Sequence, residues 1–357
     1  MTVSVSLPAR INVVGSPTDA NEGAYATISC AVPLRGGAQL HAAREWRFAR
    51  EEETSDAVSA PLGRLALVAD GFELARAAIN ALAAHSAEFA AKAARQGAAI
   101  TTWTRVPKSS GLAGSSVLVL AVLAGLRALF DLDCRRHNDY LLAEIAQRAE
   151  ENELGITCGF ADRYVPLFGG LAYLSYHGKL HHRPVGEEPY ATYEPLAQVE
   201  ADLRFVVATT GVARDSGDVH RPMRQRYLRE RSAGDGPLLA LARALGETAW
   251  RGKIALLGGD LVEFGRQISL NQSLIDEMMR LCGFTSGAGL EVRRLVDAAL
   301  AAGALGAKLT GAGGGGAIFA LPSLGGADAL AAALRAAGAA AVFVLPVASA
   351  GLQVERT

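Results

Sequence analysis

Residues 115–129 form the segment that most limits how this chain can fold. They are apolar almost throughout, so a helix over them would be apolar on every side rather than along one stripe. A surface helix needs a polar face, and this segment does not offer one. We therefore expect a helix at the centre of a domain, with other elements packed around it.

Strands and helices alternate irregularly on both sides of this segment. Val3, Val5 and Leu7 recur at every second position, which is typical of a strand. A polar stretch with several Gly and Pro at residues 177–200 separates two unequal halves. We predict an α+β fold with two domains, residues 1–190 and 191–357. The other expected strands are 24–32, 101–106, 203–209, 307–310, 317–321 and 341–346, and the expected helices are 74–95, 115–129, 138–155, 237–257, 290–302 and 327–337.

The composition argues against several classes of protein. The 357 residues hold 35 Lys and Arg against 36 Asp and Glu, a net charge of −1, so we expect no basic surface for nucleic acid. Cys30, Cys134, Cys158 and Cys282 lie far apart without metal-ligand spacing, which argues against a disulfide scaffold or a zinc site. No apolar run reaches the ~20 residues that span a bilayer, and the N-terminus has no signal-peptide pattern. We expect a cytoplasmic monomer or homodimer that binds a small molecule, with no nucleic acid or membrane as partner.

Residues 311–316 have the sequence Gly-Ala-Gly-Gly-Gly-Gly and match the pattern G-x-G-x-x-G of dinucleotide-binding proteins. In those proteins the loop opens a helix, so that the pyrophosphate meets the helix N-terminus. Here residues 317–321 continue as a strand, which argues against that site and against a dinucleotide-dependent oxidoreductase. Two explanations of the glycines stay open. They form a tight hairpin, or they present a backbone surface to a ligand or another loop.

The segment before the buried helix has the properties of a phosphate-binding loop. Small residues let the main chain approach an anion, and a helix N-terminus offers it unpaired N–H groups. The P-loop sequence G-x-x-x-x-G-K-[ST] is absent, and a Ser cap on the helix would explain the same residues without any ligand. The candidate phosphate-binding residues are Lys108, Ser109, Ser110, Gly111, Leu112, Ala113, Gly114, Ser115 and Ser116.

Charged side chains at two places are candidates for catalysis or metal binding. Glu150 and Glu151 stand at the C-terminal end of an expected helix, where the helix dipole makes acids mildly unfavourable. Arg10 lies in an otherwise apolar strand, and Asp162 lies in the expected loop after the acidic helix end. A solvated helix end, an edge-strand charge and a surface Asp-Arg pair would account for the same residues. The pattern alone does not decide between these explanations.

Three segments, in this order, resemble the motifs of the GHMP kinase superfamily, which includes galactokinase, homoserine kinase, mevalonate kinase and phosphomevalonate kinase. Pro8-Ala-Arg-Ile-Asn-Val-Val-Gly-Ser-Pro-Thr-Asp19 resembles the first motif. Pro107-Lys-Ser-Ser-Gly-Leu-Ala-Gly-Ser-Ser116 resembles the phosphate loop, and Lys308-Leu-Thr-Gly-Ala-Gly-Gly-Gly-Gly316 resembles the third motif. The resemblance covers essentially the whole chain. It implies a ribosomal-S5-domain-2-like N-terminal domain, a ferredoxin-like C-terminal domain and a nucleotide in the cleft between them.

Further details look most like glucuronokinase within this superfamily. They are the string Gly15-Ser-Pro-Thr-Asp19, the loop Gly-Leu-Ala-Gly-Ser-Ser, Glu153-Leu-Gly-Ile with the following Gly-x-x-Asp-Arg163, and Asp215-Ser-Gly-Asp-Val-His220. The complete third motif departs from that subfamily and leaves other sugar kinases open. The resemblance implies a kinase that uses ATP and Mg²⁺ and phosphorylates the anomeric hydroxyl of D-glucuronate. The alternatives are a kinase of a neutral hexose or a heptose phosphate, and a catalytically silent sensor of sugar and ATP on the same fold.

The resemblance also implies roles for individual residues. Asp162 takes the place of the catalytic carboxylate, which accepts or orients the proton of the attacking hydroxyl. Arg10 stabilises this carboxylate and the charge on the transferred phosphoryl group. Main-chain N–H groups of the phosphate loop bind the nucleotide phosphates. Ser115 and an acid at the helix end hold Mg²⁺, with Glu151 preferred to Glu150.

The acceptor is expected to meet both halves of the chain. Asp19 would bind sugar hydroxyls, while Gly313 and Gly314 would close the site from the second domain. A uronate carries a carboxylate, which the planar donor fork of Arg suits well. A solvated basic helix face over residues 221–231 would explain some of these Arg residues without any acceptor. The Arg candidates for binding the carboxylate are Arg163, Arg214 and Arg224.

Overall fold

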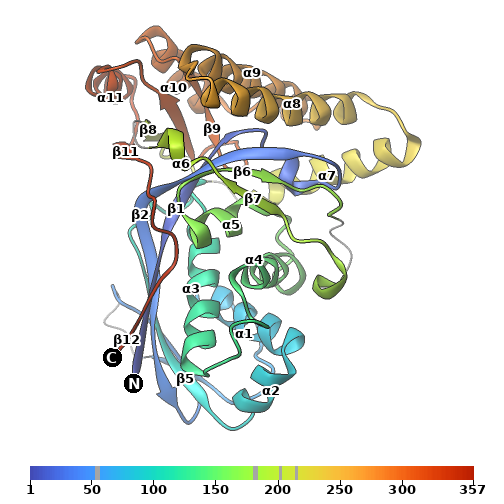
Figure 1. Cartoon of the computed structure of the whole chain (residues 1–357), viewed down its shortest axis with the longest axis vertical. Coiled ribbons are helices and arrows are strands. Elements are labelled where there is room, and N and C mark those ends of the chain that lie inside the picture. The colour runs from blue at the N-terminus through green and yellow to red at the C-terminus, as the bar shows by residue number, and fades with distance from the viewer. Residues whose placement is uncertain (53–56, 180–183, 201–202, 214–215) are drawn as a thin grey trace.

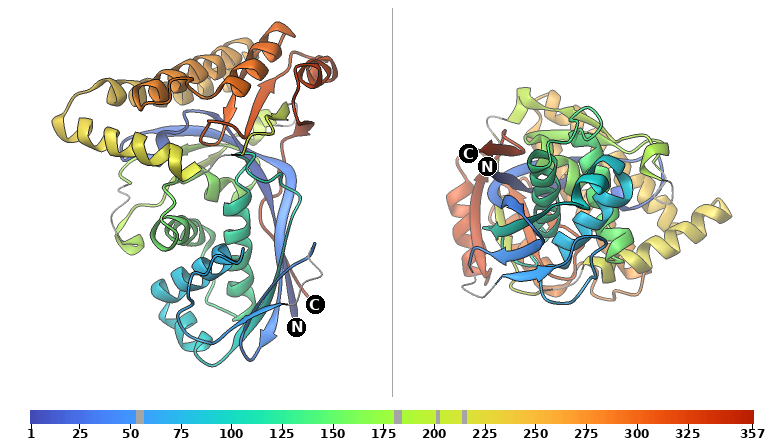
Figure 2. Two further views of the ribbon diagram at one scale, coloured as in Figure 1. Left: turned by 180° about the vertical axis from the view of Figure 1, so that it is seen from behind. Right: turned by 90° about the horizontal axis from the view of Figure 1, so that it is seen from below.

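The computed structural model of the chain describes residues 1–52, 57–179, 184–200, 203–213 and 216–357. Its elements form two layered units (Figure 1). The larger unit has an eight-stranded sheet with helices packed against it, and the smaller unit has a four-stranded sheet with its own helices (Figure 2). The predicted α+β fold with two domains is confirmed. Within the described residues no helix is both long enough and apolar enough to cross a membrane.

The large sheet has the strand order β12-β1-β2-β5-β3-β4, and β6 pairs with β2 and with β7. Strands β3 and β5 are parallel, and the other pairs are antiparallel. The last strand returns to the edge beside the first, so the two termini lie close together (Figure 1). The strands are β1 (Thr2–Val14), β2 (Ala26–Ala43), β3 (Trp46–Arg50), β4 (Val58–Ala60), β5 (Gly97–Thr104), β6 (Leu171–Ser175), β7 (Thr192–Pro195) and β12 (Gln353–Arg356).

The small sheet is antiparallel throughout and has the order β11-β8-β10-β9. Its side chains alternate between two buried faces. Val207 and Phe319 pack toward residues of β1 and β2, whereas Val206 and Ile318 pack toward the helices of the small unit. The sheet therefore joins the two units through a continuous apolar contact. Its strands are β8 (Arg204–Thr209), β9 (Gly306–Thr310), β10 (Ala317–Leu321) and β11 (Ala341–Pro346).

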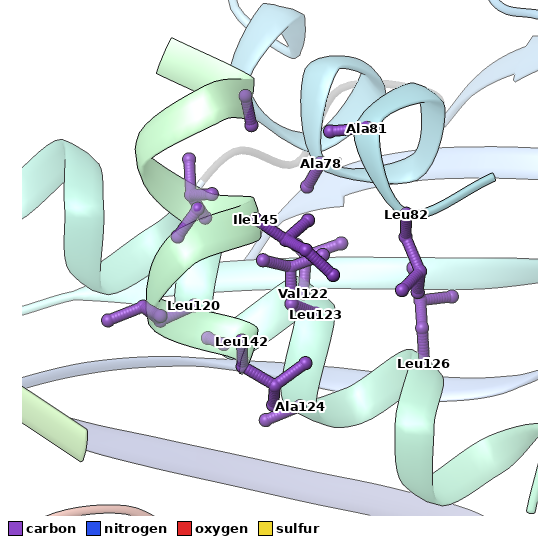
Figure 3. Packing of buried hydrophobic residues seen from close by; sticks show 14 of the residues in the cluster. Ala78, Ala81, Leu82, Leu120, Val122, Leu123, Ala124, Leu126, Leu142 and Ile145 are labelled. Carbon is purple, nitrogen blue, oxygen red and sulfur yellow. The ribbon is translucent and has the colours of Figure 1, made fainter. Parts of the chain in front are cut away.

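Helix α3 (Gly114–Leu129) is the central helix that the sequence predicts. It packs against β1, β2, α1 and α4, and Leu120, Leu123 and Leu126 have no exposed surface. Figure 3 shows these side chains among those of α1 and α4. The N-terminus of α3 is thereby fixed within the large unit. The other helices of this unit are α1 (Glu73–His85), α2 (Ala87–Ala93), α4 (Asp139–Arg148) and α5 (Ala161–Phe168), with short turns η1 (Thr18–Ala20), η2 (Ala149–Glu153) and η3 (Val185–Glu187).

Several helices differ from the prediction. The expected helix 74–95 is two helices, because Ser86 breaks the first and caps the second by accepting the N–H of Phe89. Asp162 lies in the first turn of α5 rather than in a loop. No helix was predicted for residues 261–281, which form α9. The helices of the small unit and its connections are α6 (Ala197–Glu200), α7 (Ser216–Ala233), α8 (Pro237–Leu257), α9 (Leu261–Leu281), α10 (Leu290–Ala301) and α11 (Ala327–Ala336).

The predicted boundary between residues 190 and 191 stays a prediction. Two strands beyond it, β7 and β12, pair within the large sheet. The chain therefore leaves the large unit after β7 and comes back to it at the C-terminus. The polar residues of the segment 177–200 indicate where the chain leaves the large unit. They do not indicate that β12 pairs with the large sheet at the other end of the chain.

Candidate active site

One cavity of about 880 Å³ is lined by residues of both units. The large unit contributes β1, the turn after it, the loop before α3, the first turn of α3 and the start of α5. The small unit contributes α7 and the loop between β9 and β10. The predicted site residues that line the cavity are Arg10, Asp19, Lys108, Ser109, Ser110, Gly111, Ala113, Gly114, Ser115, Ser116, Glu150, Asp162, Arg163 and Gly313.

The loop before α3 leaves the N-terminus of this helix without a side-chain cap. Ala113 is the N-cap residue and has a left-handed backbone, φ 67°; its methyl side chain has no atom that could cap the helix. The helix begins at Gly114, so Ser115 and Ser116 lie within its first turn. The alternative explanation of these residues, a Ser cap, is therefore wrong. The free N–H groups and the helix dipole together favour an anion at this end of the cavity.

The glycine-rich segment is both a hairpin and a contact surface, so each of the two open explanations holds. It connects the antiparallel strands β9 and β10. A Cβ on Gly311 would lie 2.7 Å from Cα of Gly111, and a Cβ on Gly111 would lie 2.5 Å from the carbonyl oxygen of Thr310. The two loops therefore touch through their backbones. Gly313 lines the cavity, whereas Gly314 donates its N–H to the loop before α10 and lies outside the lining.

Arg10 and Asp162 form an ion pair at the wall of the cavity. Nε of Arg10 donates to Oδ1 of Asp162 at 2.7 Å, and Nη2 lies 2.6 Å from the same oxygen. Nη1 of Arg10 donates to the carbonyl oxygen of Gly111 at 2.6 Å. The Arg10 side chain is 2% exposed and the Asp162 side chain 23%. Oδ2 of Asp162 has only Arg163, at 3.9 Å, among the described residues, so this oxygen is left for a ligand.

Asp19 lies in turn η1 and is buried against the start of α5. Its Oδ2 accepts the N–H of Ala161 at 3.1 Å. A Cβ on Gly159 would lie 2.1 Å from that oxygen, so only Gly allows this approach. Burial, and next the charge of Asp162, raise the pKa of Asp19, against the opposing effect of the Ala161 N–H and of two guanidinium groups. A carboxyl group at this place can accept a hydrogen bond from a hydroxyl group.

Glu150 faces the cavity from turn η2. Its Oε2 accepts a hydrogen bond from Oγ of Ser116 at 3.0 Å and also binds Arg163. Nη1 of Arg163 donates to the carbonyl oxygen of Gly159 at 2.6 Å. Burial, and to a lesser extent the charge of Arg10, lower the pKa of Arg163 to about 9. Turn η2 is thereby joined to the first turn of α3 and to α5.

Glu151 and Arg224 bind each other, and neither lines the cavity. Nε of Arg224 donates to the carbonyl oxygen of Ala20 at 2.8 Å, and Nη2 donates to that of Cys158 at 2.9 Å. Arg224 therefore ties α7 to the large unit with all of its guanidinium nitrogens. The third Arg candidate, Arg214, lies outside the described residues.

Lys308 is a buried residue next to the site to which the sequence analysis gave no role. Its Nζ donates to the carbonyl oxygens of Asn12, at 2.9 Å, and Leu309, at 2.8 Å, and lies 3.5 Å from Oγ of Ser16. Burial, and then the charge of Arg10, lower the pKa of Lys308 to about 7. One feature of the sequence could have indicated its importance, because Lys308 is a single cationic residue in an otherwise apolar strand. The same feature made Arg10 a candidate.

Other residues of the site were also missed. Asn12, Thr310 and His220 line the cavity, and Nδ2 of Asn12 lies 3.4 Å from Oδ1 of Asp162. Their sequence signal was weak, because a single Asn, Thr or His has many structural explanations. Within the described part of the chain, no group of three or more His, Cys, Asp or Glu side chains is placed to hold a metal ion.

Two family models match this chain. The model for the GHMP kinases N terminal domain matches residues 73–170, which run from α1 to the loop before β6. The model for the GHMP kinases C terminal domain matches residues 253–340, which run from the end of α8 to the residue before β11. The two matches lie in the two structural units and in the order of that family.

Curated relatives are similar to this chain over much of its length. Glucuronokinase 1 of Arabidopsis thaliana is 30% identical over 224 residues, which is 60% of this chain and 55% of that protein. The D-glycero-alpha-D-manno-heptose 7-phosphate kinase of Campylobacter jejuni is 26% identical over 221 residues, 61% of this chain and 59% of that protein. The chain thus spans less than two thirds of the length of these relatives.

A solved structure agrees with the whole fold. The galactokinase of Lactococcus lactis, in complex with galactose, superposes with a TM-score of 0.77 and 19% identity. The superposition covers 99% of this chain and 95% of that one. At this identity the similarity is one of fold.

The lowered pKa of Lys308 predicts a specific dependence of stability on pH. The residue has an ordinary pKa of 10.5 and one of about 7 in the folded chain, so folding releases its proton between these values. The free energy of unfolding should therefore rise with pH across this window by more in the wild type than in Lys308→Met. Urea unfolding at pH 7, 8, 9 and 10 measures this difference.

Lys108→Met, at an exposed position, is the control and should show the same pH dependence as the wild type. The same pH dependence in the wild type and Lys308→Met would contradict the prediction.

Proposed function

Because this chain belongs to the GHMP kinase family, we propose that it transfers the γ-phosphate of ATP to a hydroxyl group of a sugar or sugar acid. Phosphoryl transfer needs a cradle for phosphates, cations that balance their charge, and a group that handles the proton of the acceptor. The observation that carries the proposal is the pair of Arg10 and Asp162 beside the uncapped N-terminus of α3.

Asp162 would accept or orient the proton of the attacking hydroxyl through Oδ2. Its other oxygen, Oδ1, is bound by two nitrogens of Arg10, so the carboxylate is held in one orientation. The charge of Arg10 would also stabilise the negative charge that develops on the transferred group. Catalysis would then rest mainly on positioning and on charge stabilisation. The presence of this pair argues against a silent sensor.

The nucleotide phosphates would bind at the loop before α3. The N–H groups of residues 111–116 lie at the start of a buried helix, where an anion is favoured. Lys108 is exposed at the rim of the cavity and would add a positive charge. The glycine-rich segment of the small unit would cover these phosphates, because its backbone already contacts Gly111.

The residues present fit Mg²⁺, which retains several waters and needs only one or two protein ligands beside substrate phosphates. Glu150 lines the cavity and has one carboxylate oxygen, Oε1, without a hydrogen bond among the described residues. Ser115 is exposed to the cavity in the first turn of α3. We propose that Ser115 and Glu150 would hold Mg²⁺, in preference to Glu151, which lies outside the cavity lining and whose two carboxylate oxygens bind Arg224 and Gln147. The bound ion would neutralise charge on the phosphates.

D-glucuronate is the acceptor that we propose first, with glucuronate 1-phosphate as the product. The similarity to glucuronokinase 1 supports it. Asp19 would bind sugar hydroxyls, and Arg163 would face the carboxylate, since its Nε is buried without a partner among the described residues. A heptose phosphate is the second candidate, because the similarity to the Campylobacter heptose phosphate kinase is of comparable extent. Both acceptors are anions, for which Arg163 and Lys108 would supply positive charge at the cavity wall.

The proposed function is tested by ATP consumption with Mg²⁺ and a panel of acceptors. The panel contains glucuronate, galacturonate, glucose, galactose, fucose, mevalonate and a heptose 7-phosphate. We expect a clear preference for glucuronate in kcat/KM. A preference for the heptose phosphate would support the proposed kinase activity and would identify the heptose phosphate, instead of glucuronate, as the acceptor. Nucleotide binding without turnover of any acceptor in the panel would count against the proposal.

Replacement of Asp162 should greatly slow phosphoryl transfer while the chain still folds. We predict that Asp162→Ala lowers kcat by about 10²–10⁴-fold, the usual effect of losing a positioned acid–base group. Asp162→Asn is the matched variant, because it keeps an oxygen that accepts hydrogen bonds from the buried Arg10 while it removes the carboxylate charge. Circular dichroism and urea unfolding check that both variants fold. Near-normal turnover in a folded variant would contradict the role of Asp162.

Replacement of Glu150 should weaken the use of Mg²⁺. We predict that Glu150→Gln raises the Mg²⁺ concentration for half-maximal activity at least about tenfold, as is common when a metal site loses a carboxylate contact. Glu151→Gln is the control and should change this concentration little. Calorimetric titration of Mn²⁺ in the presence of a non-hydrolysable nucleotide provides a second measurement. A larger effect in Glu151→Gln than in Glu150→Gln would reverse the assignment.

A further inference from the structure

Helix α7 turns one face toward the large unit, and this face begins at the cavity. Positions 220, 224, 227 and 231 follow the helical spacing of three and four residues. Arg224 binds the large unit as described above, and Tyr227 lies 2.7 Å from the hydroxyl of Tyr25. Arg231 binds Glu22 at 2.7 Å. Three of the four residues on this face therefore fasten α7 to the large unit.

His220 is the fourth residue of this face and has a different environment. It is half-buried and lines the cavity together with Asp162 and Arg163. Neither of its ring nitrogens makes a hydrogen bond to the part of the chain that the structure describes. The anchors further along α7 hold the ring at the cavity wall, so its polar atoms are available to a ligand.

Burial is the main influence on the protonation state of His220, and the charges around it act as well. Burial is the main cause that lowers its pKa, to about 4, and the guanidinium groups of Arg224, Arg163 and Arg10 act in the same direction, while Asp162 opposes them. The ring is therefore neutral near pH 7, with one N–H donor and one nitrogen acceptor. Such a ring matches a hydroxyl group, which also donates and accepts. The Arg side chains around it match carboxylate and phosphate groups instead.

We propose that His220 binds a second hydroxyl group of the acceptor, other than the one attacked, and so contributes to acceptor selection. This inference rests on the proposed function of the chain as a sugar kinase. His220 would touch the substrate without taking its proton, because a ring with such neighbours is a poor base and Asp162 stands in the same cavity. The small unit would thus contribute to acceptor recognition through a side chain of α7.

The test compares steady-state kinetics of the wild type, His220→Ala, His220→Asn and His220→Gln with the best acceptor of the panel. We expect His220→Ala to raise KM for the acceptor about 3- to 10-fold, the usual effect of one lost neutral hydrogen bond. KM for ATP should stay the same and kcat should change less than KM. Asn and Gln offer an amide near the positions of Nδ1 and Nε2, so at least one should restore KM. Gln225→Ala, at an exposed position of α7, is the matched control.

Deoxy analogues of the acceptor identify the hydroxyl group. For the analogue that lacks the hydroxyl bound by His220, the wild type and His220→Ala should have the same KM. An unchanged KM for the acceptor in His220→Ala would overturn the inference, as would an equal rise in KM for ATP or failure of both amides to restore KM. If the wild type turns over no acceptor, the proposed function fails. Calorimetric binding of the panel sugars to the wild type and His220→Ala then tests the residue separately.

Discussion

The guanidinium group of Arg10 is buried, and it can remain charged there only because its nitrogens have partners from three distant parts of the chain. Asp162 supplies the opposite charge, and the carbonyl oxygen of Gly111 and the hydroxyl of Thr310 lie within reach of Nη1. A buried charge without such partners would be strongly unfavourable. The phosphate loop, the start of α5 and the end of β9 must therefore meet at Arg10, and this requirement fixes the geometry of the site. The backbone contact between Gly111 and the glycine-rich segment follows from the same convergence.

Much of the fold could be predicted from the sequence, because local patterns determine it. The apolar run of α3 requires burial on all sides, and the strands β8 to β11 and helices α8, α10 and α11 have clear periodicity or clear ends. The resemblance carried by the three motifs predicted three of the segments that line the cavity, whereas the part of α7 that lines it was missed. Helix α9 was missed, and so was the return of β12, whose pairing with β1 depends on a partner at the other end of the chain.

The choice between Glu150 and Glu151 shows why side-chain roles were harder to predict. The two acids are neighbours, and a regular helix would turn them about 100° apart. The turn that contains them is a π-helix, so the direction of each side chain depends on where the helix widens. Arg224 also binds Glu151 from a helix more than 70 residues away in sequence. A pattern in one sequence does not reveal such a partner. From the sequence alone, the Arg residues of α7 were therefore consistent with an acceptor site and with a solvated surface.

The two units contribute different kinds of groups to the cavity. The large unit contributes charged side chains and the helix N-terminus, which suit phosphate groups and a reacting hydroxyl. The small unit contributes mainly glycine backbone, Thr310 and the half-buried His220. Arg224, Tyr227 and Arg231 hold α7 in place from outside the cavity. His220, which faces the cavity, can therefore vary without loss of the Arg10–Asp162 pair. A division of this kind would let one fold accept different ligands, since changes on α7 would alter the cavity wall and would leave the Arg10–Asp162 pair in place.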